Sequence, residues 1–291
     1  MGRVPQRPIK DLEEAEGTRY GRKRGKQVKL RKPPVIEAWI EFFLDLSEEP
    51  LNAEGAFDMS AAKKFVYEEM DGTFDEKFED IRYEVRGGFA NRDGNVKFAP
   101  EVQFDRLRAR NAGKNICLQV GRDVLVFNQL KVRNEWHGYE KMRDAAFDSL
   151  AKFLKYRGLK GVRHVGLSYR DLIRFPEGTA ESVEKYLQVS PKYPDSFGKM
   201  MLFNLGLHLP AGIEETILDL NVKSVRPTEE NANCSMLLMD WQMRPTEKVI
   251  GYPDFGRDWL DLAHQEIKKR FVMVFTPKGL DLFEPEEDGH D

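Results

Sequence analysis

Apolar residues recur with two different periods along the chain, and the switches between these periods predict alternating strands and helices. In residues 35–46, β-branched and aromatic residues alternate in part with acidic ones after Pro33 and Pro34, which favours a strand over a helix. Residues 59–70 place their apolar side chains on one helical face. We therefore expect a strand followed by a short amphipathic helix.

Three short antiparallel strands and a long helix are expected next. Residues 87–94 contain two glycine turns and are interpreted as irregular, whereas the strands are expected at 101–110, 116–120 and 124–127. The alternation in 101–110 slips by one residue, which indicates a bulge. Residues 140–157 have a helical apolar stripe that stops at Gly158, the residue type that most often closes a helix.

The remainder of the chain repeats this order of elements. We expect a strand at 164–175 with a register shift near Asp171, short helical or irregular pieces at 181–189 and 197–207, long strands at 213–225 and 233–243, and a helix at 258–271. No repeat is visible residue by residue, so a duplication is inferred from element order alone.

These elements predict an α+β fold in two halves, each of the order strand, helix, strands, helix. The halves span residues 33–160 and 161–291, and the second ends in a short acidic tail. Consecutive strands closed by long helices are typical of an antiparallel sheet with helices on one face. We expect one or two antiparallel sheets carrying long helices in a helix-grip or saddle-like arrangement.

Charge separates an N-terminal segment from the rest of the chain. Residues 1–32 contain eleven Lys or Arg and four acidic residues, a net charge of +7, and subtracting this from the total of −3 leaves −10 for residues 33–291. The segment has few large apolar residues and no period, so we expect a flexible basic arm.

Lys and Arg side chains in such an arm bind polyanions through phosphate contacts and counterion release. The arm therefore predicts a nucleic-acid partner or an acidic protein partner; docking on its own acidic body and a purely solubilising role remain the alternatives. The residues expected to make these contacts are Arg19, Tyr20, Arg22, Lys23, Arg24, Lys26, Lys29, Arg31 and Lys32.

Composition points to an ordered cytoplasmic protein. Apolar residues make up 41% of the 291 and charged residues 33%, a globular balance. Cys117 and Cys234 are too few for a disulfide scaffold and suit a reducing compartment. No apolar run is long enough to span a bilayer, and no apolar segment follows the basic N-terminus as it does in a secretory signal. We expect no membrane partner, whereas a protein complex or a homo-oligomer remains open.

Several short motifs resemble a sporadically distributed family of prokaryotic proteins of roughly this length. They lie at Pro33 to Ala38, Trp136 to Tyr139, His164 to Pro176, and Leu262 to Phe271 followed by a turn at Thr276. The resemblance extends over about residues 33–283. It implies a cytosolic protein with the scattered distribution typical of mobile or defence-linked genes, and it implies no activity. The family usually has a basic residue in place of Ser168 and Asn in place of Asp171, so this strand carries an altered charge here.

The motifs of common catalytic and metal sites are absent from the sequence. No phosphate-binding loop, no closely spaced His or Cys pair and no nucleophile elbow occurs, so we expect no cofactor, no metal and no catalytic residue. The chemistry-bearing residues that could line a pocket between sheet and helices are Trp136, His164, Tyr169, Arg170 and His264. The sequence favours a non-enzymatic binding protein, an accessory of a defence or mobile-element system; the alternative is an enzyme or small-ligand sensor.

Overall fold

The computed structural model describes residues 30–46, 59–70, 74, 76–92, 95–111, 113, 115–133, 135–175, 183–190, 203–225, 235–246 and 254–285, and for 76–92, 95–105 and 254–255 it describes the backbone alone. The strands are β1 (Val35–Leu44), β2 (Glu76–Arg92), β3 (Asn95–Arg110), β4 (Ile116–Gly121), β5 (Val124–Leu130), β6 (Val162–Phe175), β7 (Asn204–Pro210), β8 (Thr216–Val225) and β9 (Ser235–Pro245). The helices are α1 (Met59–Lys64), the π-helical turn η2 (Phe65–Glu69), α2 (Tyr139–Arg157), α3 (Val183–Tyr186), α4 (Asp254–Val274) and α5 (Pro277–Asp281).

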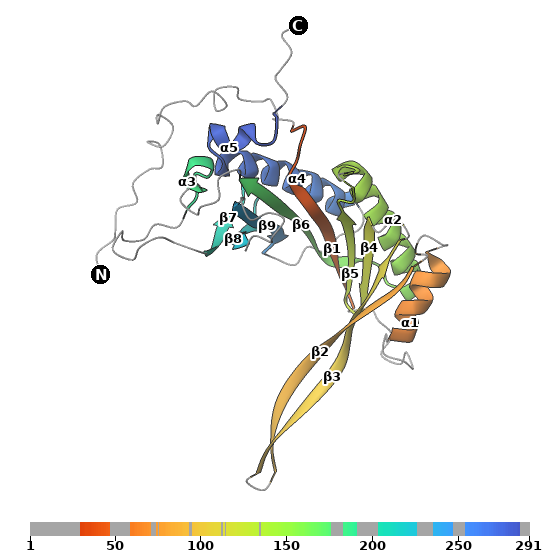
Figure 1. The fold of residues 1–291 in the computed structure, drawn as a ribbon. Helices are drawn as coiled ribbons and strands as arrows, with labels where there is room; N and C mark the ends of the chain where they lie inside the picture. Colours follow the sequence, from red (N-terminus) through yellow and green to blue (C-terminus); the bar gives the residue numbers. More distant parts are fainter. Residues whose placement is uncertain are drawn as a thin grey trace, which may run out of the picture.

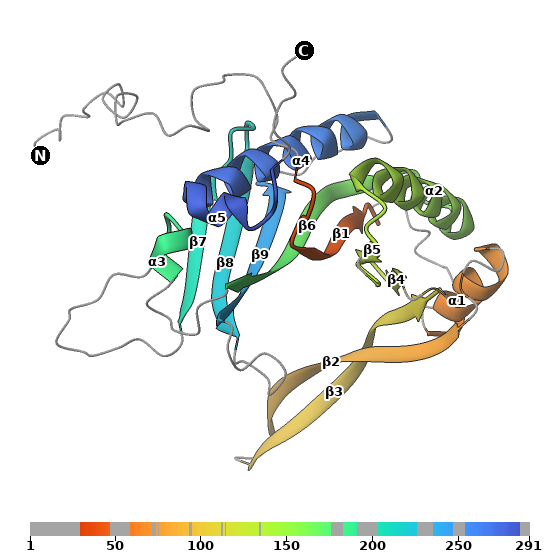
Figure 2. The ribbon, with the colours of Figure 1, turned by 45° about the horizontal axis from the view of Figure 1, so that its top comes forward.

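The described strands form one nine-stranded sheet in the order β2-β3-β4-β5-β1-β6-β9-β8-β7, and every neighbouring pair is antiparallel. The first strand of the chain is its centre, because β1 pairs with β5 on one side and with β6 on the other. β2 and β3 form a long ribbon that extends away from the helices (Figures 1 and 2). Hence the first described strand lies between two strands from the middle of the sequence.

The alternation of β1 shows how the sheet acquires two different faces. Ala38, Ile40 and Phe42 are fully buried on one face, and Trp39 and Glu41 lie between them on the other. Successive side chains of a strand point to opposite faces, so the buried set defines the helix-covered face of the whole sheet. The opposite surface is called the open face below.

Helices α2 and α4 lie on the buried face (Figure 2). α2 contacts β1 and β5, and α4 contacts β6 and β9. Phe147 of α2 packs edge-on against Phe42, with 5.4 Å between the ring centroids, and Phe271 of α4 lies 6.1 Å from the ring of Trp241. α2 ends where Gly158 adopts φ 66°, as its sequence predicted. Both helices and both ends of the chain therefore share one hydrophobic core.

The predicted fold class is wrong. The sequence predicted two halves, each closed by a long helix in a helix-grip or saddle-like fold, whereas the molecule is mostly one large antiparallel sheet with few helices. Four of the six described helical elements have six residues or fewer. The physical reason is strand length: β2 has 17 residues and runs into the region 87–94 that the sequence predicts to be irregular, and β3 has 16 residues and begins before the strand predicted at 101–110.

Two smaller expectations also differ from the structure. The helix expected at 59–70 is α1 followed by the wider turn η2, and the helical or irregular piece expected at 197–207 contains the start of β7. The register shifts expected near Phe104 and near Asp171 occur, between Arg82 and Tyr83 in the ribbon and between Val35 and Glu37 where β1 meets β6. Local irregularities were therefore easier to predict than the length of the ribbon.

The last residues of the predicted arm pair with the C-terminal part of the described chain. Leu30 forms an isolated antiparallel bridge with Pro285, and the backbone N–H groups of Arg31 and Lys32 donate to the carbonyls of Glu284 and Phe283 at 3.1 Å. Lys32 Nζ also contacts Glu284 Oε1 at 2.5 Å. Residues 30–32 are thus fixed beside residues 283–285. Among the described helices, none combines the length and apolarity needed to cross a membrane.

Candidate ligand-binding site

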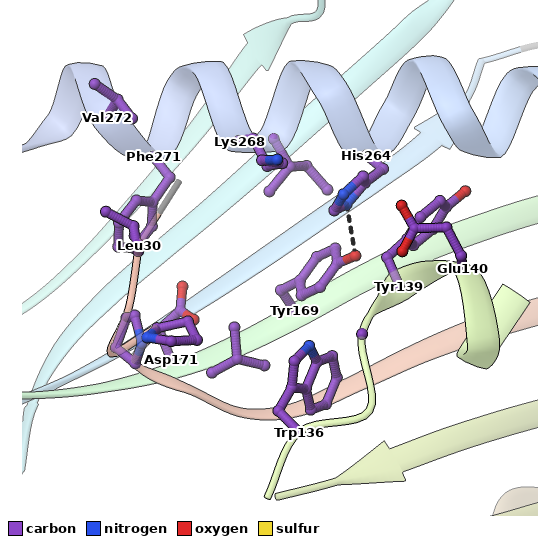
Figure 3. A pocket seen from close by; sticks show the side chains of 15 residues that line it. Leu30, Trp136, Tyr139, Glu140, Tyr169, Asp171, His264, Lys268, Phe271 and Val272 are labelled. Atoms are coloured by element: carbon purple, nitrogen blue, oxygen red, sulfur yellow. Dashed lines mark hydrogen bonds between the residues drawn. The ribbon is translucent and has the colours of Figure 1, made fainter. Parts of the chain in front are cut away.

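A cavity of about 320 Å³ lies between α4, β6 and the segments that lead into β1 and α2 (Figure 3). This volume falls at the lower end of the range of small-molecule sites. The cavity is lined by Leu30, Pro33, Pro34, Val35, Trp136, Gly138, Tyr139, Glu140, Tyr169, Asp171, His264, Ile267, Lys268, Phe271 and Val272. The walls are therefore mainly apolar and aromatic, with a few polar groups among them.

One wall comes from the short connection before α2. Gly138 has φ +88°, a conformation that costs a residue with a side chain considerable strain, and it lets the chain turn between Trp136 and Tyr139. Both aromatic side chains consequently reach the cavity from one turn (Figure 3). The Trp-His-Gly-Tyr motif is therefore an element that builds this wall.

His264 of α4 is held between two tyrosines. Its ring stacks on that of Tyr139, with centroids 3.9 Å apart and planes 6° apart, and its Nδ1 is 2.8 Å from the hydroxyl of Tyr169 (Figure 3). Burial, and next the charge of Lys268, lower the pKa of His264 to about 4, so the ring is neutral at neutral pH. Burial raises the pKa of Tyr169 well above its usual range, so its hydroxyl stays protonated.

Tyr139 is in turn fixed by a charged pair between the two long helices. Its hydroxyl donates to Asp261 Oδ1 at 2.9 Å, and Arg143 Nη1 donates to both oxygens of Asp261 at 2.7 and 2.8 Å. Burial and the bond to Asp261 raise the pKa of Tyr139. These bonds hold α2 against α4, so the stacked rings form a rigid wall rather than an adaptable one.

Asp171 supplies a buried polar group to the lining of the cavity. Its side chain projects from β6, is 2% exposed, and accepts a hydrogen bond from Trp241 Nε1 through Oδ2 at 2.9 Å. Oδ1 is equally buried and has no hydrogen-bond partner within the described part of the chain. Burial raises the pKa of this carboxyl to about 7, with the bond from Trp241 lowering it and the charge of Asp240 adding to the rise. A buried acceptor without a hydrogen-bond partner lowers the stability of the fold, so its presence calls for an explanation such as a bound ligand.

The structure brings together some of the predicted pocket residues. Trp136, Tyr169 and His264 line the one cavity, whereas His164 and Arg170 do not. Tyr169 and Asp171 share the buried face of β6, and the strand's alternation sends Arg170 to the open face. His164 lies there as well, edge-on to Phe43 with ring centroids 6.4 Å apart. That the cavity binds a ligand remains a prediction.

Arg170 belongs instead to a row of hydrogen bonds and ion pairs across the open face, here called the polar ladder. Arg170 Nε donates to Asp240 Oδ1 at 2.6 Å, and Nη1 to Glu37 Oε2 at 3.3 Å. Its guanidinium also lies over the ring of Trp39, 5.5 Å from the centroid. The ladder takes one side chain from each of six neighbouring strands, in the order Gln119, Asn128, Glu37, Arg170, Asp240 and Lys223.

Sequence reasoning missed Asp171, Tyr139 and the segment before β1 as parts of the site. The parity of β6 was a usable signal for Asp171, because a residue two positions after Tyr169 shares its face. Of the residues expected to bind nucleic acid or an acidic partner, Arg31 and Lys32 are described beside Glu284. The others, Arg19, Tyr20, Arg22, Lys23, Arg24, Lys26 and Lys29, lie outside the described residues.

Comparison with known proteins does not add to this picture. No protein-family model matches the chain, and no curated protein matches it. The expected resemblance to a scattered prokaryotic family therefore remains a prediction. The site must be interpreted from its own geometry.

Proposed function

We propose that this chain is a ligand-binding protein that holds a small organic molecule in the cavity beneath α4. The observation that carries the proposal is Asp171 Oδ1, a buried acceptor without a described partner that lines an aromatic-walled cavity. Few precisely placed polar groups in an apolar cavity are typical of small-molecule sites. A bound ligand with a hydrogen-bond donor would satisfy this oxygen.

Binding is favoured over general-base catalysis by His264 because this residue is already engaged with its neighbours. His264 Nδ1 is bonded to Tyr169, and the ring is stacked on Tyr139. A general base needs a free nitrogen facing its substrate, with a pKa near the working pH. The pKa of His264 is about 4, well below that range. Among the described lining residues there is no Ser, Thr or Cys to act as a nucleophile.

A fragment screen on the full chain tests this proposal. Ligand-observed NMR with equal numbers of aromatic cations, neutral compounds and anions should find binders that Trp136→Ala loses. Trp39→Ala is the matched control, since Trp39 is also a half-buried tryptophan but lies on the open face. The proposal fails if no fragment binds, or if both variants keep the same binders. Thermal unfolding of each variant establishes that it is folded.

The basic arm adds a separate proposal, namely contact with nucleic acid or an acidic partner protein. It rests on the sequence charge of +7, and residues 1–29 lie outside the described residues. Deleting residues 1–26 keeps Leu30 and its bridge to Pro285, so the body should unfold at an unchanged temperature. Binding to duplex DNA or RNA at low salt should disappear. Undiminished binding by the truncated chain would show that the arm is not the segment that binds nucleic acid. An accessory role in defence or mobile-element systems stays a prediction.

A further inference from the structure

The polar and aromatic groups of the cavity define the charge of its ligand. We propose that the cavity takes an organic cation, a protonated amine on an apolar or aromatic body, whose nitrogen donates a hydrogen bond to Asp171 Oδ1. This inference rests on the proposed binding function and adds the chemical class of the ligand.

The first support is the chemistry of the unpaired oxygen. Oδ2 of Asp171 is satisfied by Trp241, whereas Oδ1 has no hydrogen-bond partner within the described part of the chain and, once the carboxyl is ionised, accepts from a ligand. Hydrogen bonds between ionised partners are roughly twice as strong as neutral ones, and they compensate a buried carboxylate where a neutral donor does so only in part. An ammonium is therefore a better partner for Asp171 than a hydroxyl.

The second support is the ring of aromatic side chains around the cavity. Trp136 and Tyr139 come from the connection into α2, Tyr169 from β6 and Phe271 from α4 (Figure 3). The faces of such rings carry partial negative charge and attract cations, and more strongly where water is excluded. Four rings from three elements thus provide a favourable surface for a desolvated ammonium.

The third support is the charge of the lining. Asp171 and Glu140 supply two carboxyl groups, and Lys268 supplies one ammonium. Lys268 follows His264 by one helical turn on α4, and it is a charge that lowers the pKa of His264. The positive charge of Lys268 therefore acts on His264, whereas the carboxyl of Asp171 comes from a different element, β6. Proline, isoleucine and phenylalanine fill the rest of the lining and match an apolar body.

Binding of an isosteric series measures the charge preference directly. The probes are 2-phenylethylammonium, the neutral 2-phenylethanol and the anionic 3-phenylpropionate, titrated into the full chain at pH 8 by calorimetry. The ammonium should bind about tenfold or more tightly than the alcohol, because a hydrogen bond to a charged group contributes more than one between neutral groups. The carboxylate should bind most weakly of the three.

Asp171→Asn should abolish this preference and leave the affinity for 2-phenylethanol within about threefold, since the aromatic walls are unchanged. Asp148→Asn is the matched control, because it makes the same substitution at an exposed position of α2 outside the cavity lining and should keep the preference. Asp171→Ala, which also removes the charge, provides a second variant should the asparagine chain fail to fold.

The outcomes separate this inference from the proposed function. Equal affinities for the ammonium and the alcohol, or a preference that persists in Asp171→Asn, would overturn the cation assignment. Neutral or anionic fragments that bind more tightly than the aromatic cations and are lost in Trp136→Ala would overturn it too, while leaving a binding cavity. The absence of any binder in the fragment screen would remove both proposals together.

Discussion

Replacing Asp171 by asparagine should change how the stability of the fold depends on pH. The pKa of this carboxyl rises from 3.8 to about 7 on folding, because burial favours the protonated form. The folded chain therefore holds a proton that the unfolded chain releases between these two values. Its contribution to stability is present below pH 3.8 and is lost as the pH rises to 7.

The size of this effect follows from the shift of about three pKa units, which corresponds to roughly 4 kcal/mol at full ionisation. Between pH 5 and pH 8 the share lost is roughly 2–3 kcal/mol. His264 acts in the opposite sense, because its pKa falls from 6.5 to about 4 and its contribution grows as the pH rises from 4 to 6.5. The two groups therefore offset each other in the native chain below pH 6.5.

Urea unfolding of the native and Asp171→Asn chains at pH 5, 6, 7 and 8, followed by tryptophan fluorescence, tests the reasoning. The free energy of unfolding of the variant, relative to the native chain, should rise by roughly 2–3 kcal/mol from pH 5 to pH 8. The substitution also lowers the free energy of unfolding by the same amount at every pH, because the new amide nitrogen is a buried donor in the place of the unpaired oxygen. That loss is constant and cancels in the comparison.

Asp148→Asn is the control, because it makes the same substitution at an exposed position of α2 and should produce no such rise. If the free energies of unfolding of the Asp171→Asn and native chains differ by an amount that stays constant within about 0.5 kcal/mol from pH 5 to 8, the raised pKa of Asp171 is refuted.

The remaining predictions concern the polar ladder and two glycines. Arg170→Met should lower the free energy of unfolding by about 1–2 kcal/mol, because the half-buried carboxylates of Glu37 and Asp240 each lose this partner. In a double-mutant cycle, adding Glu37→Gln to Arg170→Met should recover part of this loss. Gly279→Ala should destabilise by about 1–3 kcal/mol, because its Cβ would overlap the carbonyl oxygen of Tyr186. Gly256→Ala, whose Cβ would make ordinary contacts 3.5 Å or more away, should be neutral or stabilising; equal thermal shifts for the two glycine variants would contradict this.

The parts of the fold that the sequence predicted are those with a clear period. The partial alternation of β-branched and aromatic residues in β1 and the helical stripe that ends at Gly158 identify their elements without tertiary context. The ribbon of β2 and β3 could not be found this way, because charged residues and Gly87-Gly88 interrupt its pattern. The length of the ribbon comes from backbone hydrogen bonds between the two strands. Backbone pairing affects the pattern of residue types in a sequence less than burial does.

The types of residue that line the site could be predicted from the sequence, whereas the face on which each side chain lies was harder to predict. Aromatic and histidine residues of the short motifs suggest Trp136, Tyr169 and His264, and these three do meet in one cavity. Arg170 belongs to the same motif as Tyr169, but adjacent strand residues face opposite ways. The sequence predicts a register shift near Asp171, and the strand's alternation places this carboxyl on the face of Tyr169.

The bridge between Leu30 and Pro285 tethers two oppositely charged segments at one point. Eight basic residues occupy positions 19–32, and four acidic residues occupy positions 284–288. Segments joined so closely meet at effective concentrations on the order of millimolar, with no need for a specific contact. If the basic segment binds a polyanion, as proposed, we expect the acidic tail to compete with that polyanion for it. A chain without residues 286–291 should bind DNA or RNA more tightly than the intact one, and the gain should vanish at high salt.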